Sequence, residues 1–219
     1  HYPSRLYDLY DPPKILFACG NIHLLKHPMI AIVGARGAST EGLRNAALFA
    51  AALSDAGILV ISGLARGIDG SAHQATLAYK NGFSTVAVCG TGLNKCYPAE
   101  HQGLAKEIVK DGLLLSELPP NEGPKTYHFP RRNRIIAALS LGVVVIQAAS
   151  RSGSLITARL AAELGREVFA VPGPIGDPLY TGCHQLIQQG AKLVCSPKEV
   201  LEELTFLENR TFGPFKGHF

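Results

Sequence analysis

Residues 30–70 read IAIVGARGASTEGLRNAALFAAALSDAGILVISGLARGIDG. Two apolar runs, at 30–33 and 58–61, each lead into a glycine-rich loop, and a helix-like stretch at 41–56 lies between them. Short runs that are apolar at every position are typical of parallel strands covered by helices on both faces, whereas a half-exposed strand alternates between apolar and polar residues. The segment therefore predicts a β-α-β unit with a glycine-rich loop after each strand.

The same alternation of apolar runs and helix-like stretches continues to residue 204. Further strands are expected at 15–18, 85–89, 113–116, 143–147, 168–171 and 192–195, and further helices at 70–80, 98–110, 132–141, 154–164, 184–189 and 197–204. Such alternation predicts an α/β fold with a doubly wound, mostly parallel sheet and helices on both faces. The periodicity is lost from Thr205, so we expect one domain over residues 1–204 and a linker or tail over 205–219.

The composition excludes several classes of protein. Of the 219 residues, 47% are hydrophobic and 17% charged, which is incompatible with a disordered chain. No apolar stretch reaches the roughly 18 residues that span a bilayer, and the first four residues lack the basic and apolar regions of a signal peptide. The five cysteines form no C-x-x-C pair, so we expect reduced thiols in a cytoplasmic protein that binds no metal and no membrane.

Arginine is concentrated in one part of a chain whose net charge is only +4. Six arginines and no lysine occur between residues 131 and 166, where Glu163 is the single acidic residue. Because the guanidinium group pairs bidentately with phosphate and carboxylate groups, this bias indicates recognition of such groups. A basic face that is merely solvated remains the alternative.

Glycine and small hydroxyl residues follow four of the expected strands, in loops that begin at Gly34, Ser62, Gly90 and Ser150. Parallel strands end at one edge of a sheet, where ligands of doubly wound proteins bind. Glycine lets phosphate approach the backbone, and helix N-termini donate to it, so an anionic ligand is expected across this edge. Neither a G-x-G-x-x-G after the first strand nor a P-loop is present, and no nucleotide cofactor is expected.

Aromatic and arginine residues are interleaved at 127–134, which read YHFPRRNR. Single-stranded nucleic acid is bound by this combination, because aromatic planes stack on bases and arginines neutralise the backbone. In the alternative interpretation, Tyr127 and Phe129 fill the core while the arginines face water.

Three long motifs, GLARGIDGSAH (63–73), FPRRNRIIAALS (129–140) and SGSLITARLAAELGREVFAVPG (152–173), resemble those of the DNA-processing protein A (DprA/Smf) family. The resemblance covers residues 5–204. It implies an extended Rossmann-like fold without cofactor, in a cytosolic bacterial protein of natural transformation, competence and DNA recombination. Members of the family bind single-stranded DNA, protect incoming strands, help load the RecA recombinase and work as homodimers. They commonly carry a helical domain before this region and often a winged-helix domain after it, neither of which is recognised in residues 1–219.

The resemblance maps a basic DNA-binding pocket onto Arg36, the stretch 129–134, the turn 152–154 and Arg166, with Lys125 nearby. Combined with the glycine-rich loops, the expected DNA-binding residues are Arg36, Gly34, Gly63, Arg66, Gly90, Thr91, Gly92, Lys125, Phe129, Arg131, Arg134, Ser152, Gly153, Ser154 and Arg166. The family's dimer contact maps onto His184, Ile187 and Leu193, although many members have [ST]-N where this chain has Cys183-His184. Arg166 precedes a strand, so the argument from the sheet edge places it at the opposite end from the other residues.

Several residues keep alternative roles. Asp69 opens a helix, where it is expected as an N-cap or an arginine partner, and His73 lies one turn later, in position to pair with it. Glu117 is a candidate partner for Arg132 or Arg134, so the sequence leaves open which arginines face DNA.

An enzyme is the competing function. Phosphoribohydrolases of a related Rossmann-like group act on nucleotide monophosphates and carry P-G-G-x-G-T-x-x-E, whose glutamate performs the hydrolysis. Residues 151–157 read RSGSLIT, and Thr157 stands where that glutamate would be, so no catalytic residue is expected. A carrier of a small molecule or cofactor is the third class considered.

Overall fold

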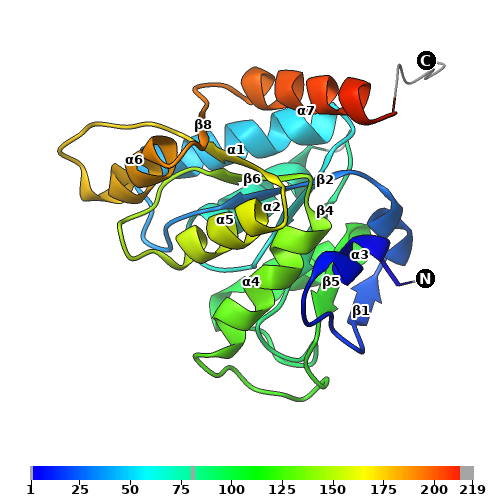
Figure 1. Cartoon of the computed structure of the whole chain (residues 1–219). Coiled ribbons are helices and arrows are strands. Elements are labelled where there is room, and N and C mark those ends of the chain that lie inside the picture. The colour runs from blue at the N-terminus through cyan, green and yellow to red at the C-terminus, as the bar shows by residue number, and fades with distance from the viewer. Residues whose placement is uncertain (1, 80–81, 213–219) are drawn as a thin grey trace.

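The computed structural model describes residues 2–79 and 82–212 and confirms the predicted α/β fold (Figure 1). These residues form one eight-stranded sheet in the order β1-β5-β4-β3-β2-β6-β7-β8. All neighbouring strands are parallel except β1 and β5. The strands are β1 (Phe17–Gly20), β2 (Met29–Val33), β3 (Leu59–Ser62), β4 (Thr85–Val88), β5 (Leu113–Ser116), β6 (Gly142–Val145), β7 (Glu167–Ala170) and β8 (Lys192–Leu193).

Helices cover both faces of the sheet, as the apolar runs predicted. One face is covered by α4 (His128–Leu139), α5 (Gly153–Glu163) and α6 (Thr181–Gln188), and the other by α1 (Thr40–Asp55), α2 (Ile68–Ala78), α3 (Gln102–Asp111) and α7 (Pro197–Phe212). In β2, Ala31 and Val33 join the core beneath α4, while Ile30 and Ile32 join the core beneath α1. Each residue of a central strand thus buries its side chain, which explains why the runs do not alternate.

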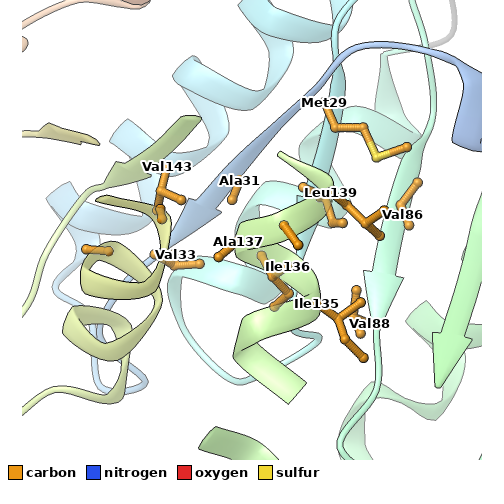
Figure 2. Packing of buried hydrophobic residues seen from close by; sticks show 14 of the residues in the cluster. Met29, Ala31, Val33, Val86, Val88, Ile135, Ile136, Ala137, Leu139 and Val143 are labelled. Atoms are coloured by element: carbon orange, nitrogen blue, oxygen red, sulfur yellow. The ribbon is translucent and has the colours of Figure 1, made fainter. Parts of the chain in front are cut away.

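The helix α4 occupies the middle of its face (Figure 2). Ile135 and Leu139 are buried and lie against Val88 and Val86 of β4. Since burial of each large aliphatic side chain contributes roughly 1.5–3 kcal/mol, this contact fixes α4, and the residues at its N-terminus, relative to the sheet.

Several helix boundaries differ from the expected ones: α3 begins at Gln102 rather than at residue 98, α6 at Thr181 rather than at residue 184, and α4 and α7 also differ. α4 begins at His128 rather than at residue 132, because Pro130 falls within the first turn, where backbone N–H groups need no helical partner. α7 continues to Phe212, past Thr205, where its end was predicted; no glycine or proline interrupts the chain before Gly213-Pro214. The expected helix end at Lys80 and the rest of the expected tail, residues 213–219, lie outside the described residues.

The order of the strands reverses at β2. The chain proceeds outward from β2 through β3 and β4 to β5, and β6 then pairs with the other side of β2. Loops that follow β2 and β6 leave on opposite faces of the sheet, which opens a crevice between them. Among the described residues, no helix combines the length and the hydropathy that crossing a membrane requires.

Candidate nucleic-acid interface

A cleft of about 710 Å³ lies at this reversal point, at the carboxyl ends of β2 and β6. Its walls include the end of β2 and the loop after it (33–37), the connection from β6 into the first turn of α5 (Ala149 and 151–154), and the first turns of α4. Two of the four glycine-rich loops therefore line it directly. Of the other two loops, the one after β3 reaches it with Ala65, whereas Gly90, Thr91 and Gly92 do not line it.

Gln147 joins the two walls. Its backbone oxygen accepts a hydrogen bond from the Ala35 N–H at 2.7 Å, and its side-chain oxygen accepts one from the Ser39 N–H at 3.0 Å. Its amide nitrogen in turn donates to the Ser39 hydroxyl at 2.8 Å. Gln147 is fully buried, so these bonds are shielded from water and hold the loop after β2 against the end of β6.

Two exposed arginines in the cleft, Arg36 and Arg151, form no ion pair with any residue that the structure describes. The guanidinium carbon of Arg36 lies 5.6 Å from the centroid of the Phe129 ring, a cation–π distance. Because neither charge has an acidic partner within the described part of the chain, both are available to an anionic ligand.

The N-terminus of α5 also opens into the cleft. Ser152 caps this helix, with its hydroxyl accepting from the Ser154 N–H at 3.4 Å. Gly153 and Gly37 line the cleft at positions where an added Cβ would meet no atom within 4 Å. The packing of the protein therefore does not require glycine here, and the positive end of the α5 dipole is open to an approaching anion.

The other expected glycines serve internal packing. A Cβ on Gly63 would lie 2.6 Å from the Arg132 guanidinium, and one on Gly90 would lie 2.7 Å from the Phe129 ring. A Cβ on Gly34 would likewise lie 2.6 Å from the Ile68 side chain, and one on Gly92 would overlap the Pro119 carbonyl oxygen. Thr91 is buried and donates to the Lys95 carbonyl at 2.6 Å. These residues shape the loops around the cleft; Gly34 also lines the cleft, whereas Gly63, Gly90, Thr91 and Gly92 do not.

Arg132 is buried beneath the cleft and is held entirely by protein groups. It donates to the carbonyls of Gly63 and Val88, and its Nε to Asn133 Oδ1 at 3.2 Å. Asp69 accepts from the N–H groups of Gly63 at 3.1 Å and Ala65 at 3.4 Å. Burial raises the pKa of Asp69 and lowers the pKa of Arg132. The positive charge of Arg132 partly offsets the first shift, and the negative charge of Asp69 partly offsets the second. Asp69 thus binds the backbone of the loop and contributes a compensating charge near Arg132; the N-cap of α2 is Gly67.

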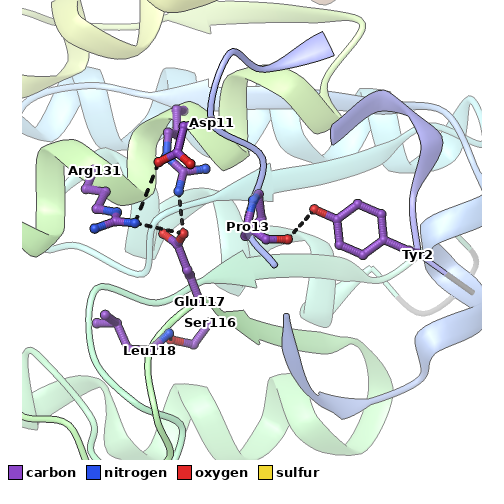
Figure 3. A network of polar contacts seen from close by, with 8 residues as sticks. Tyr2, Asp11, Pro13, Ser116, Glu117, Leu118 and Arg131 are labelled. Carbon is purple, nitrogen blue, oxygen red and sulfur yellow. Dashed lines mark hydrogen bonds and ion pairs between the residues drawn. The ribbon is translucent and has the colours of Figure 1, made fainter. Parts of the chain in front are cut away.

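Glu117 is confirmed as an arginine partner (Figure 3). It accepts from Arg131 at 3.2 Å and from Arg134. The side chain of Arg134 is only 13% exposed, whereas that of Arg131 is 53% exposed and also lies 3.8 Å from Asp11. Arg134 is therefore enclosed in a structural ion pair, and Arg131 is the one of the two that faces solvent.

The remaining basic candidates lie at or beyond the rim. Arg66 is paired with Glu100, and Lys125 with the half-buried Glu122 at 2.6 Å; both basic side chains are exposed, so a ligand can displace the partner. Arg166 pairs with Asp8 and donates to the Ala138 carbonyl, at the amino-terminal end of β7. The structure therefore does not bring Arg166 into the cleft.

The cleft is also lined by Arg151 and Tyr97, which were not among the expected site residues, and by Asn133, which belongs to the expected stretch 129–134. Arg151 lies in the loop that begins at Ser150, which the sequence indicated as part of the site, so its charge could have identified it as a site residue. Asn133 comes from α4 and donates to the Gly153 carbonyl at 3.3 Å. Tyr97 had no sequence signal, because the chain travels well past the end of β4 before it reaches the cleft.

The three residues expected at a dimer contact lie together at the β8 end of the sheet. Leu193 of β8 is 46% exposed, Ile187 packs partly on the core, and His184 Nε2 lies 3.0 Å from the Gly173 carbonyl.

The model of the family described as DNA recombination-mediator protein A matches residues 1–205. The chain is 50% identical over 205 residues to the DNA processing protein DprA of Streptococcus pneumoniae, covering 94% of this chain and 72% of that protein. It is 52% identical over 206 residues to Protein Smf of Escherichia coli, of which it covers 54%.

Solved structures agree with these relatives. The crystal structure of the Streptococcus pneumoniae DprA superposes with a TM-score of 0.88, over 92% of this chain and 70% of that one. DNA processing protein A from Helicobacter pylori, studied for its single-stranded DNA binding mode, superposes with a TM-score of 0.86 at 29% identity, over 94% of each chain.

One histidine beside this site is fully buried. Thr85 uses its hydroxyl hydrogen for the Val60 carbonyl, so the His73 Nδ1–H donates to Thr85 Oγ1 at 2.8 Å. His73 Nε2 has no partner among the described residues, and the expected pairing with Asp69 is not formed. Burial, with smaller contributions from His101 and Arg132, lowers the pKa of His73 from 6.5 to about 3. His73 is therefore a neutral core residue.

This burial predicts a pH dependence of stability. Below pH 6.5 the unfolded chain binds a proton at His73 while the folded chain does not, so the free energy of unfolding falls by about 1.4 kcal/mol per pH unit until the folded pKa is reached. Replacing His73→Gln removes this contribution, and urea titrations between about pH 6.5 and 4.5 should show a shallower loss than in the unsubstituted protein. The exposed control His23→Gln should retain the original slope; parallel curves for His73→Gln would contradict the assignment.

Proposed function

Since the chain belongs to the DNA recombination-mediator protein A family, we propose that its cleft binds single-stranded DNA in the cytoplasm during natural transformation. We further propose that this binding protects incoming strands and helps to load the RecA recombinase onto them. The observation that carries the proposal is the cleft at the β2–β6 reversal, with two unpaired arginines, a helix N-terminus and aromatic rings. The chain spans about half to three quarters of these relatives, so activities of a longer protein are proposals as well.

Each part of the cleft suits one part of a single strand. Arg36 and Arg151 provide charge for phosphate groups, and the N-terminus of α5 provides backbone donors. Tyr97, which packs on the Phe129 ring, provides aromatic surface for bases, which only an unpaired strand exposes. The combination of arginines and aromatic rings in the cleft therefore favours binding of a single strand over binding of a duplex.

Binding without chemistry is the function that the side chains favour. Among the described residues that line the cleft, Asp69 is the only acidic one, and its carboxylate is committed to backbone N–H groups and Arg132. Thr157, which replaces the glutamate of the phosphoribohydrolases, is buried in the cleft wall. The nucleotide-hydrolysing alternative lacks its base, and we propose a binding protein rather than an enzyme.

The electrostatic part of this proposal is tested by Arg36→Ala. For a single strand, each phosphate neutralised by the protein contributes about 0.7 to the slope of log K against log salt concentration. Titration of a labelled single-stranded oligonucleotide at several salt concentrations should give a slope flatter by about this amount in the variant. An unlabelled duplex of the same length should compete more weakly than the unlabelled single strand.

Arg166→Ala is the matched control, because Arg166 lies outside the cleft. Its slope should equal that of the unsubstituted protein. An unchanged slope for Arg36→Ala, or equal competition by duplex and single strand, would contradict the proposed interface.

Gly153 offers a second test, because a Cβ there meets no protein atom. Gly153→Ala should leave the melting temperature unchanged or slightly higher, since alanine restricts the unfolded chain. It should nevertheless weaken single-strand binding about tenfold if phosphate approaches the α5 N-terminus, because a hydrogen bond to a charged group contributes at least that much. Gly103→Ala, in the first turn of α3 and equally open, is the control that should bind normally. Normal binding by both variants would exclude a phosphate at Gly153.

We also propose that two copies associate through His184, Ile187 and Leu193. Leu193 lies on the edge strand β8, whose outer backbone groups and exposed leucine are suited to an isologous contact. Light scattering should show a dimer, and Leu193→Arg should give a folded monomer with a cooperative thermal transition. Ile15→Arg, an exposed apolar position beside β1 at the other end of the sheet, should remain dimeric. A monomeric unsubstituted protein would disprove the dimer without affecting the DNA cleft.

A further inference from the structure

Tyr97 lies at the mouth of the cleft, where it lines both the main cavity and a narrow crevice shared with Gly63 and Arg66. Its side chain is 42% exposed. The Tyr97 ring packs at a tilt of 49° against the Phe129 ring, with 5.2 Å between the centroids. Tyr97 therefore offers an open aromatic surface that is held in place from one side.

Phe129 is much more enclosed than its neighbour. Besides Tyr97, it contacts the backbone of Gly90, where an added Cβ would come within 2.7 Å of the ring, and the Arg36 guanidinium. These three contacts take up ring surface that a base would need. Phe129 is thus better placed to support its neighbours than to stack on a ligand.

The other exposed tyrosines do not share this position. Tyr127 is 60% exposed, but it lies outside the cleft lining and packs edge-on against His128. Tyr7 and Tyr10 are also exposed and also lie outside the cleft. Tyr97 is the exposed tyrosine in the same cleft as the unpaired Arg36 and Arg151.

We propose that a base of the bound single strand stacks on Tyr97, and that Phe129 is a positioning residue that holds both Tyr97 and Arg36. Arg36 then contacts the phosphate of the nucleotide whose base lies on Tyr97, because both side chains are packed on the same Phe129 ring. Every base has a flat face, so the contact is tolerant of sequence. This inference rests on the proposed single-strand binding and assigns the base contact within it.

Affinity for two ligands of equal length tests the assignment: an oligothymidylate and the corresponding abasic deoxyribose-phosphate strand. Tyr97→Ala should weaken binding of the oligothymidylate about tenfold, within the range of single base–aromatic contacts, and leave binding of the abasic strand unchanged. Tyr97→Phe keeps the ring and should bind both ligands normally. The matched control Tyr127→Ala removes an exposed tyrosine outside the cleft and should also behave normally.

The supporting role of Phe129 is tested by Phe129→Leu and by the double variant with Tyr97→Ala. If Phe129 acts through Tyr97 and Arg36, Phe129→Leu weakens binding of both ligands, and the loss on oligothymidylate is less than additive with that of Tyr97→Ala. Melting temperatures of all variants confirm that they are folded. Additive losses would overturn the positioning role.

The outcomes separate this inference from the proposed function. If the unsubstituted protein binds neither strand, the proposed function itself fails. If it binds the oligothymidylate but Tyr97→Ala binds it equally well, or loses the same factor on the abasic strand, single-strand binding stands and the stacking role of Tyr97 is overturned.

Discussion

The buried guanidinium of Arg132 connects the parts that make the cleft. It extends from α4 to the carbonyl of Gly63 after β3 and to that of Val88 at the end of β4, with Asp69 of α2 as its counter-charge. A buried charge is tolerated only when its donors are satisfied, so the loops must adopt the conformation that satisfies them. Gly63 has to be a glycine because the guanidinium occupies the space of a side chain. The contacts of Arg132 thus hold the segments around the cleft in place.

Several of the arginines that make the sequence basic do not contribute charge to the cleft. Arg132 and Arg134 are enclosed by protein partners, and Arg166 is paired at the other end of its strand. The charge left for a ligand is concentrated in Arg36 and Arg151, next to a helix N-terminus. The proposed binding of a phosphate backbone therefore depends on these two charges, and that of the bases on the aromatic side chains of the cleft.

The sequence was sufficient for the fold, because apolar runs such as residues 143–146 report burial on both faces, and for the sheet edge at which the cleft lies. The resemblance to the DprA/Smf family was confirmed by the comparisons. The sequence did not predict which individual charges pair. Asp8 and Arg166 form an ion pair although they are 158 positions apart, and no local sequence pattern indicates that contact. Tyr97 was missed for the same reason, because only the tertiary structure brings it against Phe129.

The pairing of β2 with β6 determines when the cleft forms during folding. The two walls of the cleft are separated by more than a hundred positions, since Ser39 and Gln147 are 108 residues apart and are joined directly. Such a contact has a high loop-closure cost and forms only when both halves of the sheet have assembled. A chain that has emerged from the ribosome only as far as β5 possesses one wall and no cleft. The capacity to hold a ligand there is therefore acquired late, together with the native topology, and a ligand that bridges the walls opposes the separation of the two halves.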